Sequence, residues 1–162
     1  MNTITTTLTT KAVFSDDGTH RYSLVKTWDD TKPTLAIIML APSEASGIVL
    51  DNTTMLVLNN ASRLGYGSVT VVNLFARVDD FSLRQAEDED TENMEAILTA
   101  AQNAEVVVYA AGVGKAQSKV FQERQRQVMT ALMPYEAKLF CLTNEDGAAR
   151  LQHPLSPAVF EK

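Results

Sequence analysis

Apolar residues occur along this chain as short unbroken runs, separated by longer segments in which they recur with helical spacing. The run Leu35–Leu40 contains no polar residue, which is typical of a strand buried on both faces of a parallel sheet. Pro42 predicts its end, because proline lacks an N–H group and disfavours helix at the residue before it. Similar runs predict three further strands, at Ser68–Leu74, Glu105–Ala110 and Ala137–Leu142.

Helices are predicted in the intervals between these strands. In the segment Thr91–Asn103 apolar residues recur at positions i, i+3, i+4 and i+7, which places them on one helical face. These residues are Met94, Ile97, Leu98 and Ala101. Two more helices are predicted at Thr53–Leu64 and Gln117–Met133, and in the latter we expect Arg124 and Arg126 to face solvent.

A β-hairpin is predicted before the first central strand. The short runs Lys11–Phe14 and Arg21–Thr27 flank Asp17-Gly18, a dipeptide typical of tight turns. The hairpin is followed by the pattern β-α-β-α-β-α-β, and strands that alternate with helices form parallel sheets with right-handed crossovers. We therefore expect a three-layer α/β/α sandwich with a four-stranded parallel central sheet and an N-terminal β-hairpin. The whole chain 1–162 is expected to form a single domain, with arm and hairpin at 1–33 and the core at 34–162.

Composition narrows the functional classes. The chain has 162 residues and a formal net charge of −6, which argues against strong nonspecific binding of nucleic acid, because such binding rests on Lys and Arg. No apolar run approaches the roughly 20 residues of a membrane helix, and the N-terminus does not read as a signal peptide. We expect a cytoplasmic protein without membrane contact. The single cysteine, Cys141, lies in an apolar run and is expected to be a buried structural thiol; no metal and no cofactor are predicted.

Candidate functional residues follow the predicted strands, at the carboxyl edge where ligands bind in open α/β sheets. The Asn73 amide combines an acceptor with two donors and suits the edge of a base, although it can equally tie down its own loop. His153 can stabilise a developing anion or fix its loop. The carboxylate of Asp51 can act at this edge or cap a helix. Further ligand-binding candidates are Pro42, Ser43, Arg77, Gly112 and Ser156.

Several motifs spread over most of the chain carry a family resemblance. They include Arg21-Tyr22-Ser23-Leu24, Ala41-Pro42-Ser43-Glu44, Val71 to Arg77, Glu92-Asn93 and His153-Pro154-Leu155. In combination they resemble the domain-of-unknown-function family 1643. The layout is also similar to the uracil-DNA glycosylase superfamily, which places a proline loop, an Asn, a Gly turn and a His-Pro-Ser loop after four successive parallel strands. This resemblance implies that Asn73 reads a base edge and that His153 stabilises a departing base anion.

One departure from both patterns concerns hydrolysis. Ala41 stands where the glycosylases carry Asp or Asn and family 1643 carries Asn, and a methyl group can neither orient water nor stabilise a cationic sugar. We therefore predict a nucleotide- or nucleobase-binding protein with weak or no hydrolytic activity. Two alternatives stay open. The first is an active N-glycosidase that uses Asp51 or Asp79. The second is an acidic protein-interaction module, in which the stretch 87–92 docks on a basic nucleic-acid-binding protein.

Overall fold

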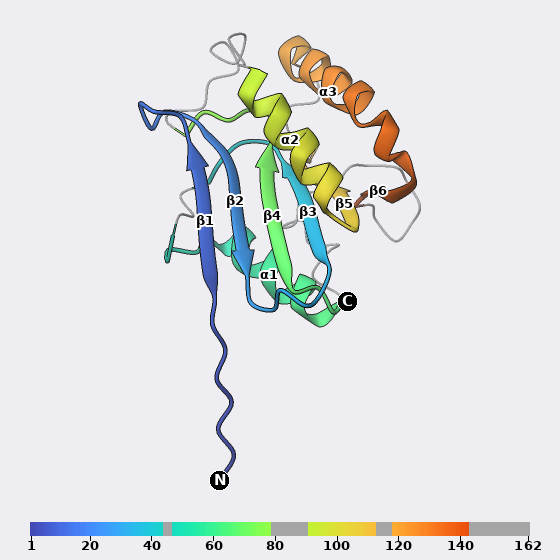
Figure 1. Cartoon of the computed structure of the whole chain (residues 1–162). Coiled ribbons are helices and arrows are strands. Elements are labelled where there is room, and N and C mark those ends of the chain that lie inside the picture. Colours follow the sequence, from blue (N-terminus) through green and yellow to red (C-terminus); the bar gives the residue numbers. More distant parts are fainter. Residues whose placement is uncertain (44–46, 79–90, 113–117, 143–162) are drawn as a thin grey trace.

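Six strands form one mixed sheet in the order β1-β2-β4-β3-β5-β6 (Figure 1). The computed structural model describes residues 1–43, 47–78, 91–112 and 118–142. The strands are β1 (Thr9–Phe14), β2 (Arg21–Thr27), β3 (Thr34–Met39), β4 (Ser68–Asn73), β5 (Val106–Tyr109) and β6 (Leu139–Cys141). Strands β4, β3, β5 and β6 run parallel to one another, whereas β2 is antiparallel to both β4 and β1.

The expected four-stranded parallel sheet is therefore corrected to a six-stranded mixed sheet. The hairpin is not a separate feature, because β2 pairs with β4 from Leu24 opposite Val71 to Thr27 opposite Ser68. This pairing satisfies the backbone groups on the edge of β4 that would otherwise be open. It also sets the direction of β2, whose first residue lies at the end where β4 finishes.

Helices lie on both faces of the sheet (Figure 1). α1 (Asn52–Arg63) packs with Leu35 and Ile37 of β3, and α2 (Thr91–Asn103) and α3 (Lys119–Ala131) pack with Ala36 and Ile38 on the opposite face. Successive side chains of a strand point to opposite faces, so β3 is buried on both, as its unbroken apolar run predicts. The helices of the described ranges are all too short or too polar to cross a membrane.

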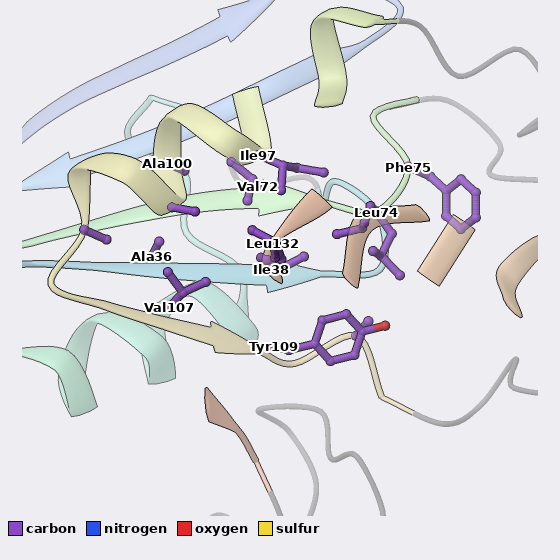
Figure 2. Packing of buried hydrophobic residues seen from close by; sticks show 14 of the residues in the cluster. Ala36, Ile38, Val72, Leu74, Phe75, Ile97, Ala100, Val107, Tyr109 and Leu132 are labelled. Atoms are coloured by element: carbon purple, nitrogen blue, oxygen red, sulfur yellow. The ribbon is translucent and has the colours of Figure 1, made fainter. Parts of the chain in front are cut away.

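The larger core cluster lies between the sheet and the helices α2 and α3 (Figure 2). Of the predicted stripe on α2, Ile97 and Ala101 belong to this cluster, and Met94 and Leu98 are partly buried and pack against it, so that prediction is confirmed. Tyr109 of β5 and Leu132 after α3 are also buried in it. Arg124 was expected in solvent and is buried instead, because it lies three residues after Phe121 and four before Val128, on the inward face of α3.

The end of the described chain differs from expectation in two respects. Residues Met133–Lys138 form a 3-10 helix with Pro134 in its first turn, so β6 begins at Leu139 rather than at Ala137. Cys141 is exposed, and the prediction of a buried thiol is wrong. The physical reason is the position of β6, which is the last strand in the sheet order and, among the described residues, has a neighbouring strand on one side only.

A buried lysine connects the hairpin to the loop after β3. Lys26 of β2 is 1% exposed, and its Nζ donates to the hydroxyl of Thr10 at 3.0 Å and to the main-chain carbonyl of Gly47. Burial of the ammonium lowers the pKa of Lys26. The hydrogen bonds compensate a charge that would be costly to bury alone, and they fix the loop that leads into α1.

Candidate functional site

The carboxyl ends of β3 and β5 form the point from which the chain leaves the sheet toward opposite faces. β3 leads to α1 on one face and β5 leads to α3 on the other, and the two strands are direct neighbours. In open α/β sheets such a topological switch point is the usual place for a ligand. Pro42 and Ser43 follow β3 here. Gly112 follows β5 with a φ of 72°, a conformation that favours glycine.

Asn73 is the last residue of the neighbouring strand β4 and lies opposite Met39. Its side chain shares a face with Val71, which packs with α1, because the two residues are separated by one strand period. Asn73 is only 1% exposed. Within the described part of the chain, neither its Oδ1 nor its Nδ2 has a hydrogen-bond partner. Its amide therefore does not tie down its own loop through these residues, which was the alternative role.

The main chain at Asn73 is held by side chains from two helices on the other face. Asn93 of α2 donates from Nδ2 to the carbonyl oxygens of Asn73 at 3.2 Å and of Leu74 at 3.1 Å. Arg124 of α3 donates from Nε to the same Leu74 oxygen at 2.8 Å. The Leu74 amide in turn donates to the carbonyl of Met39 at 2.8 Å. These contacts fix the backbone from which the Asn73 amide projects.

A second set of polar residues connects the start of β2 to the loop after β3. Arg21 is 1% exposed and donates from Nη1 to the main-chain oxygen of Ser43 at 3.3 Å. Asp51 is the N-cap of α1 and accepts a hydrogen bond from the Thr54 amide at 2.6 Å. Burial alone would raise the pKa of Asp51. Hydrogen bonds from the Ser43 side chain and from Thr54, together with the charge of Arg21, outweigh it and hold this pKa below its ordinary value.

The charge of Asp51 acts on Arg21 in return. Burial lowers the pKa of the Arg21 guanidinium, and the carboxylate of Asp51 opposes that shift. Both groups are therefore charged at neutral pH, since the arginine pKa starts far above 7 and the aspartate pKa falls below 3.8. Arg21, Ser43 and Asp51 form a charge-balanced cluster at this edge.

Arg77 lies on the hairpin side of the same edge. It pairs with His20 in an isolated antiparallel bridge, next to hydrogen bonds from the Arg21 amide to Ala76 and from the Val78 amide to Thr19. The Nε of Arg77 is buried and has no hydrogen-bond partner among the described residues. The backbone of Arg77 is thus fixed, whereas its buried Nε–H lacks an acceptor within the described part of the chain.

The predicted residues fall into three groups in the structure. Ser43 and Asp51 come together around Arg21, and Pro42, Asn73 and Gly112 stand at the ends of three adjacent parallel strands. His153, Ser156, Asp79 and residues 87–90 of the acidic stretch lie outside the described residues. Within the described ranges no group of three or more His, Cys, Asp or Glu residues is arranged to hold a metal ion.

Three polar residues that build the site were not among the candidates predicted from the sequence: Arg21, Asn93 and Arg124. Arg124 occupies a position that the apolar spacing of α3 assigns to the core, and a charged residue at such a position signals a buried contact. Arg21 and Asn93 stand inside motifs that had been recognised only as marks of resemblance. The structure gives both a physical role at the strand ends.

Comparison with protein families places most of the chain in one of them. The model of a family described as a protein of unknown function (DUF1643) matches residues 21–155. No curated protein and no solved structure matches the chain. The matched segment begins at Arg21, where β2 begins, and includes every described residue of the candidate site. The likeness of layout to the uracil-DNA glycosylases stays a prediction.

Proposed function

We propose that this chain, which belongs to the DUF1643 family, binds a nucleobase or nucleotide at the carboxyl edge of its parallel strands, with weak or no hydrolysis. The observation that carries the proposal is the Asn73 amide, which is buried and has no partner within the described residues. An unpaired buried amide costs about 1–3 kcal/mol. A site that leaves such a group unpaired in the free protein gains by pairing it with a ligand.

The chemistry of an amide supports a base as that ligand. Asn73 presents one acceptor and two donors in a single plane, and base edges present donors and acceptors in the same planar way. The contacts of Asn93 and Arg124 fix the backbone below it, so little ordering is left for the binding step. Selectivity would follow from the cost of leaving this amide unpaired against a ligand that does not match it.

Two features favour binding over hydrolysis. Ala41 offers no group to orient water or to stabilise a cation. Asp51 is engaged by Ser43, Thr54 and Arg21, and its lowered pKa makes it a weak general base at neutral pH. The carboxylate thus serves the start of α1 and the loop after β3.

The test is a thermal-shift and calorimetric panel of bases, nucleosides and nucleotides. A ligand at 100 times its Kd adds about 2.7 kcal/mol to the free energy of unfolding, which shifts Tm measurably. We expect at least one such ligand to bind the natural protein and to lose its effect in Asn73→Leu. The matched control is Asn59→Leu, an exposed position on α1. A panel without any binding, or a shift that survives in Asn73→Leu, contradicts the proposal.

Hydrolysis is the second candidate, and the ionised state of Asp51 is the observation that favours it. A carboxylate held in its charged form can stabilise a cationic sugar without acting as a base. In that case the protein releases free base from a nucleoside, a nucleotide or an oligonucleotide. Asp51→Asn would abolish the release while keeping the helix cap, since Asn is as good a cap as Asp. Absence of free base from every substrate rejects this candidate.

A further inference from the structure

We infer that the ligand carries a phosphate group and that Arg77 binds it. This inference rests on the proposed function and names the ligand class within it: a nucleotide rather than a free base or nucleoside. It is carried by the contrast between Arg77 and the other two arginines near the strand ends.

Arg21 and Arg124 are already engaged by the protein. Arg21 donates to the Ser43 carbonyl and faces the charge of Asp51, and Arg124 donates to the Leu74 carbonyl. Both are buried and act as structural cations. The Nε of Arg77 is buried and has no hydrogen-bond partner among the described residues. A buried N–H of a charged guanidinium without an acceptor is costly, and an oxyanion from a ligand would remove that cost.

The guanidinium suits phosphate in particular. Its N–H groups form a rigid planar fork that can bond two oxygens of a phosphate at once. A neutral acceptor would satisfy Nε but would leave the positive charge uncompensated. The formal net charge of −6 means that the protein as a whole repels anions. A phosphate would therefore need a local cation such as Arg77 in order to bind.

The charges at this edge leave Arg77 as the cation that can attract a phosphate. The ionised Asp51 at the start of α1 faces Arg21 at the start of β2, so these two charges oppose each other. Arg77 lies on the same hairpin side, where its backbone pairs with His20. The base therefore meets Asn73, and the phosphate points toward the hairpin.

The separation of the two residues fits a single nucleotide. Four residues of fully extended chain span at most about 14 Å, which bounds the distance between the Cα atoms of Asn73 and Arg77. A mononucleotide, with its base at one end and its phosphate at the other, can contact both.

The test measures how much a phosphate adds to affinity. Calorimetry gives the Kd of each nucleoside and of its 5′-monophosphate, with inorganic phosphate as a third probe, at low and at high salt. For the natural protein we expect the monophosphate to bind about 10- to 100-fold more tightly than the nucleoside. In Arg77→Gln this ratio should fall to near one while nucleoside affinity is kept. Arg77→Lys should recover part of the ratio, because it keeps the charge and loses the fork.

Arg63→Gln is the matched control, because Arg63 is an exposed arginine in the last turn of α1. It should leave the ratio unchanged. The inference is overturned if the ratio for the natural protein is near one, or if the full ratio persists in Arg77→Gln. Should Arg77→Gln not fold, Arg77→Met replaces it as the uncharged variant, and a full ratio in Arg77→Met has the same meaning.

The two proposals fail in different ways. A nucleoside that binds through Asn73, with a monophosphate that binds no more tightly, rejects the phosphate contact and leaves the proposed function standing. Inorganic phosphate and monophosphate that bind equally, with no nucleoside binding, support the anion contact of Arg77 and reject the reading of a base by Asn73.

Discussion

The side-chain amide of Asn93 donates to the main-chain oxygen of Asn73 at 3.2 Å, whereas the amide of Asn73 itself has no partner among the described residues. Both asparagines are buried, with exposures of 0% and 1%. Two buried asparagines thus lie close together, and they differ in role: the amide of Asn93 bonds to the protein backbone, whereas the amide of Asn73 has no partner within the described ranges. Substitutions at the two positions should therefore have opposite effects on stability.

We predict that Asn73→Leu leaves the free energy of unfolding unchanged or raises it by up to about 2 kcal/mol. The leucine removes an unpaired buried amide and fills a similar volume with an apolar group. Urea unfolding at pH 7 measures this difference. A loss of more than about 1 kcal/mol would show that the amide is hydrogen-bonded in the free protein.

Asn93→Leu should instead destabilise the protein by about 2–3 kcal/mol. It removes two hydrogen bonds and leaves the Asn73 carbonyl without that donor, while Leu74 keeps the bond from Arg124. The same urea experiment applies, and Asn59→Leu on the exposed side of α1 serves as the reference. Equal stabilities of Asn93→Leu and the reference would reject the assigned contacts.

Arg124→Met should lower the free energy of unfolding by about 1.5–3 kcal/mol. The methionine fills the space along the inward face of α3 but cannot donate to the Leu74 carbonyl, and hydrogen bonds to charged groups are the stronger ones. Arg126→Met provides the contrast on the same helix. Its guanidinium is exposed and pairs only with Glu123, so we expect a change within about 0.5 kcal/mol. Similar losses in both variants would contradict the burial of Arg124.

The stability of the protein should depend on Asp51 in acid. Its pKa is lowered in the folded state, so its charge stabilises the fold above the ordinary aspartate pKa of about 3.9, and this contribution is lost as pH falls through the folded pKa. Asp51→Asn keeps a capping side chain and lacks the charge. The stability difference between the natural protein and this variant should be largest at pH 7 and should shrink toward pH 3.

Urea unfolding at several pH values between 3 and 7 tests this prediction. Asp16→Asn, in the exposed hairpin turn, is the reference. A difference that stays constant with pH would mean that the charge of Asp51 does not contribute, and that only its cap does. Asp51→Ala separates the cap, because it should cost about a further 1 kcal/mol relative to Asp51→Asn at every pH.

Gly67→Ala should be strongly destabilising, by about 2 kcal/mol or more. A Cβ at this position would lie 1.8 Å from the carbonyl oxygen of Asp29, and that backbone is held because the Asp29 amide bonds to the Gly67 oxygen at 3.0 Å. Gly47→Ala is the matched control, since a Cβ there meets nothing within 4 Å. Thermal unfolding of the two variants measures the contrast, and equal Tm values would contradict the close approach.

The unbroken and the periodic apolar patterns predicted the strands and helices well, because the burial of one or both faces of an element determines which of its positions are apolar. The hairpin strand Arg21–Thr27 and the helix Thr91–Asn103 have the predicted bounds. The pairing of β2 with β4 could not be predicted, since partner choice depends on which sheet edge is open and not on the strand alone. The exposure of Cys141 has the same origin, because the place of β6 at the edge is a property of the assembled sheet.

The candidate site was predicted in part for a similar reason. Sequence order placed Pro42, Asn73 and Gly112 after strands, and the carboxyl ends of adjacent parallel strands do meet. Sequence order could not identify Arg21 in this way, because Arg21 begins its strand and does not follow one. Only the antiparallel direction of β2 brings it to the same edge. Asn93 and Arg124 reach the strand ends from helices, and side chains that cross from one layer to another carry no periodic signal.

The direction of β2 also decides what surrounds the strand ends. The turn between β1 and β2, residues 15–20, stands beside the segment after β4, where Thr19 and His20 contact Val78 and Arg77. A hairpin turn tolerates changes of length and sequence far better than the strands it joins. Related chains can therefore diversify the border of this site by varying one exposed turn, without altering any strand pairing of the sheet. The turn is thus a position at which sequence can change beside the candidate site while the sheet that carries the site stays the same.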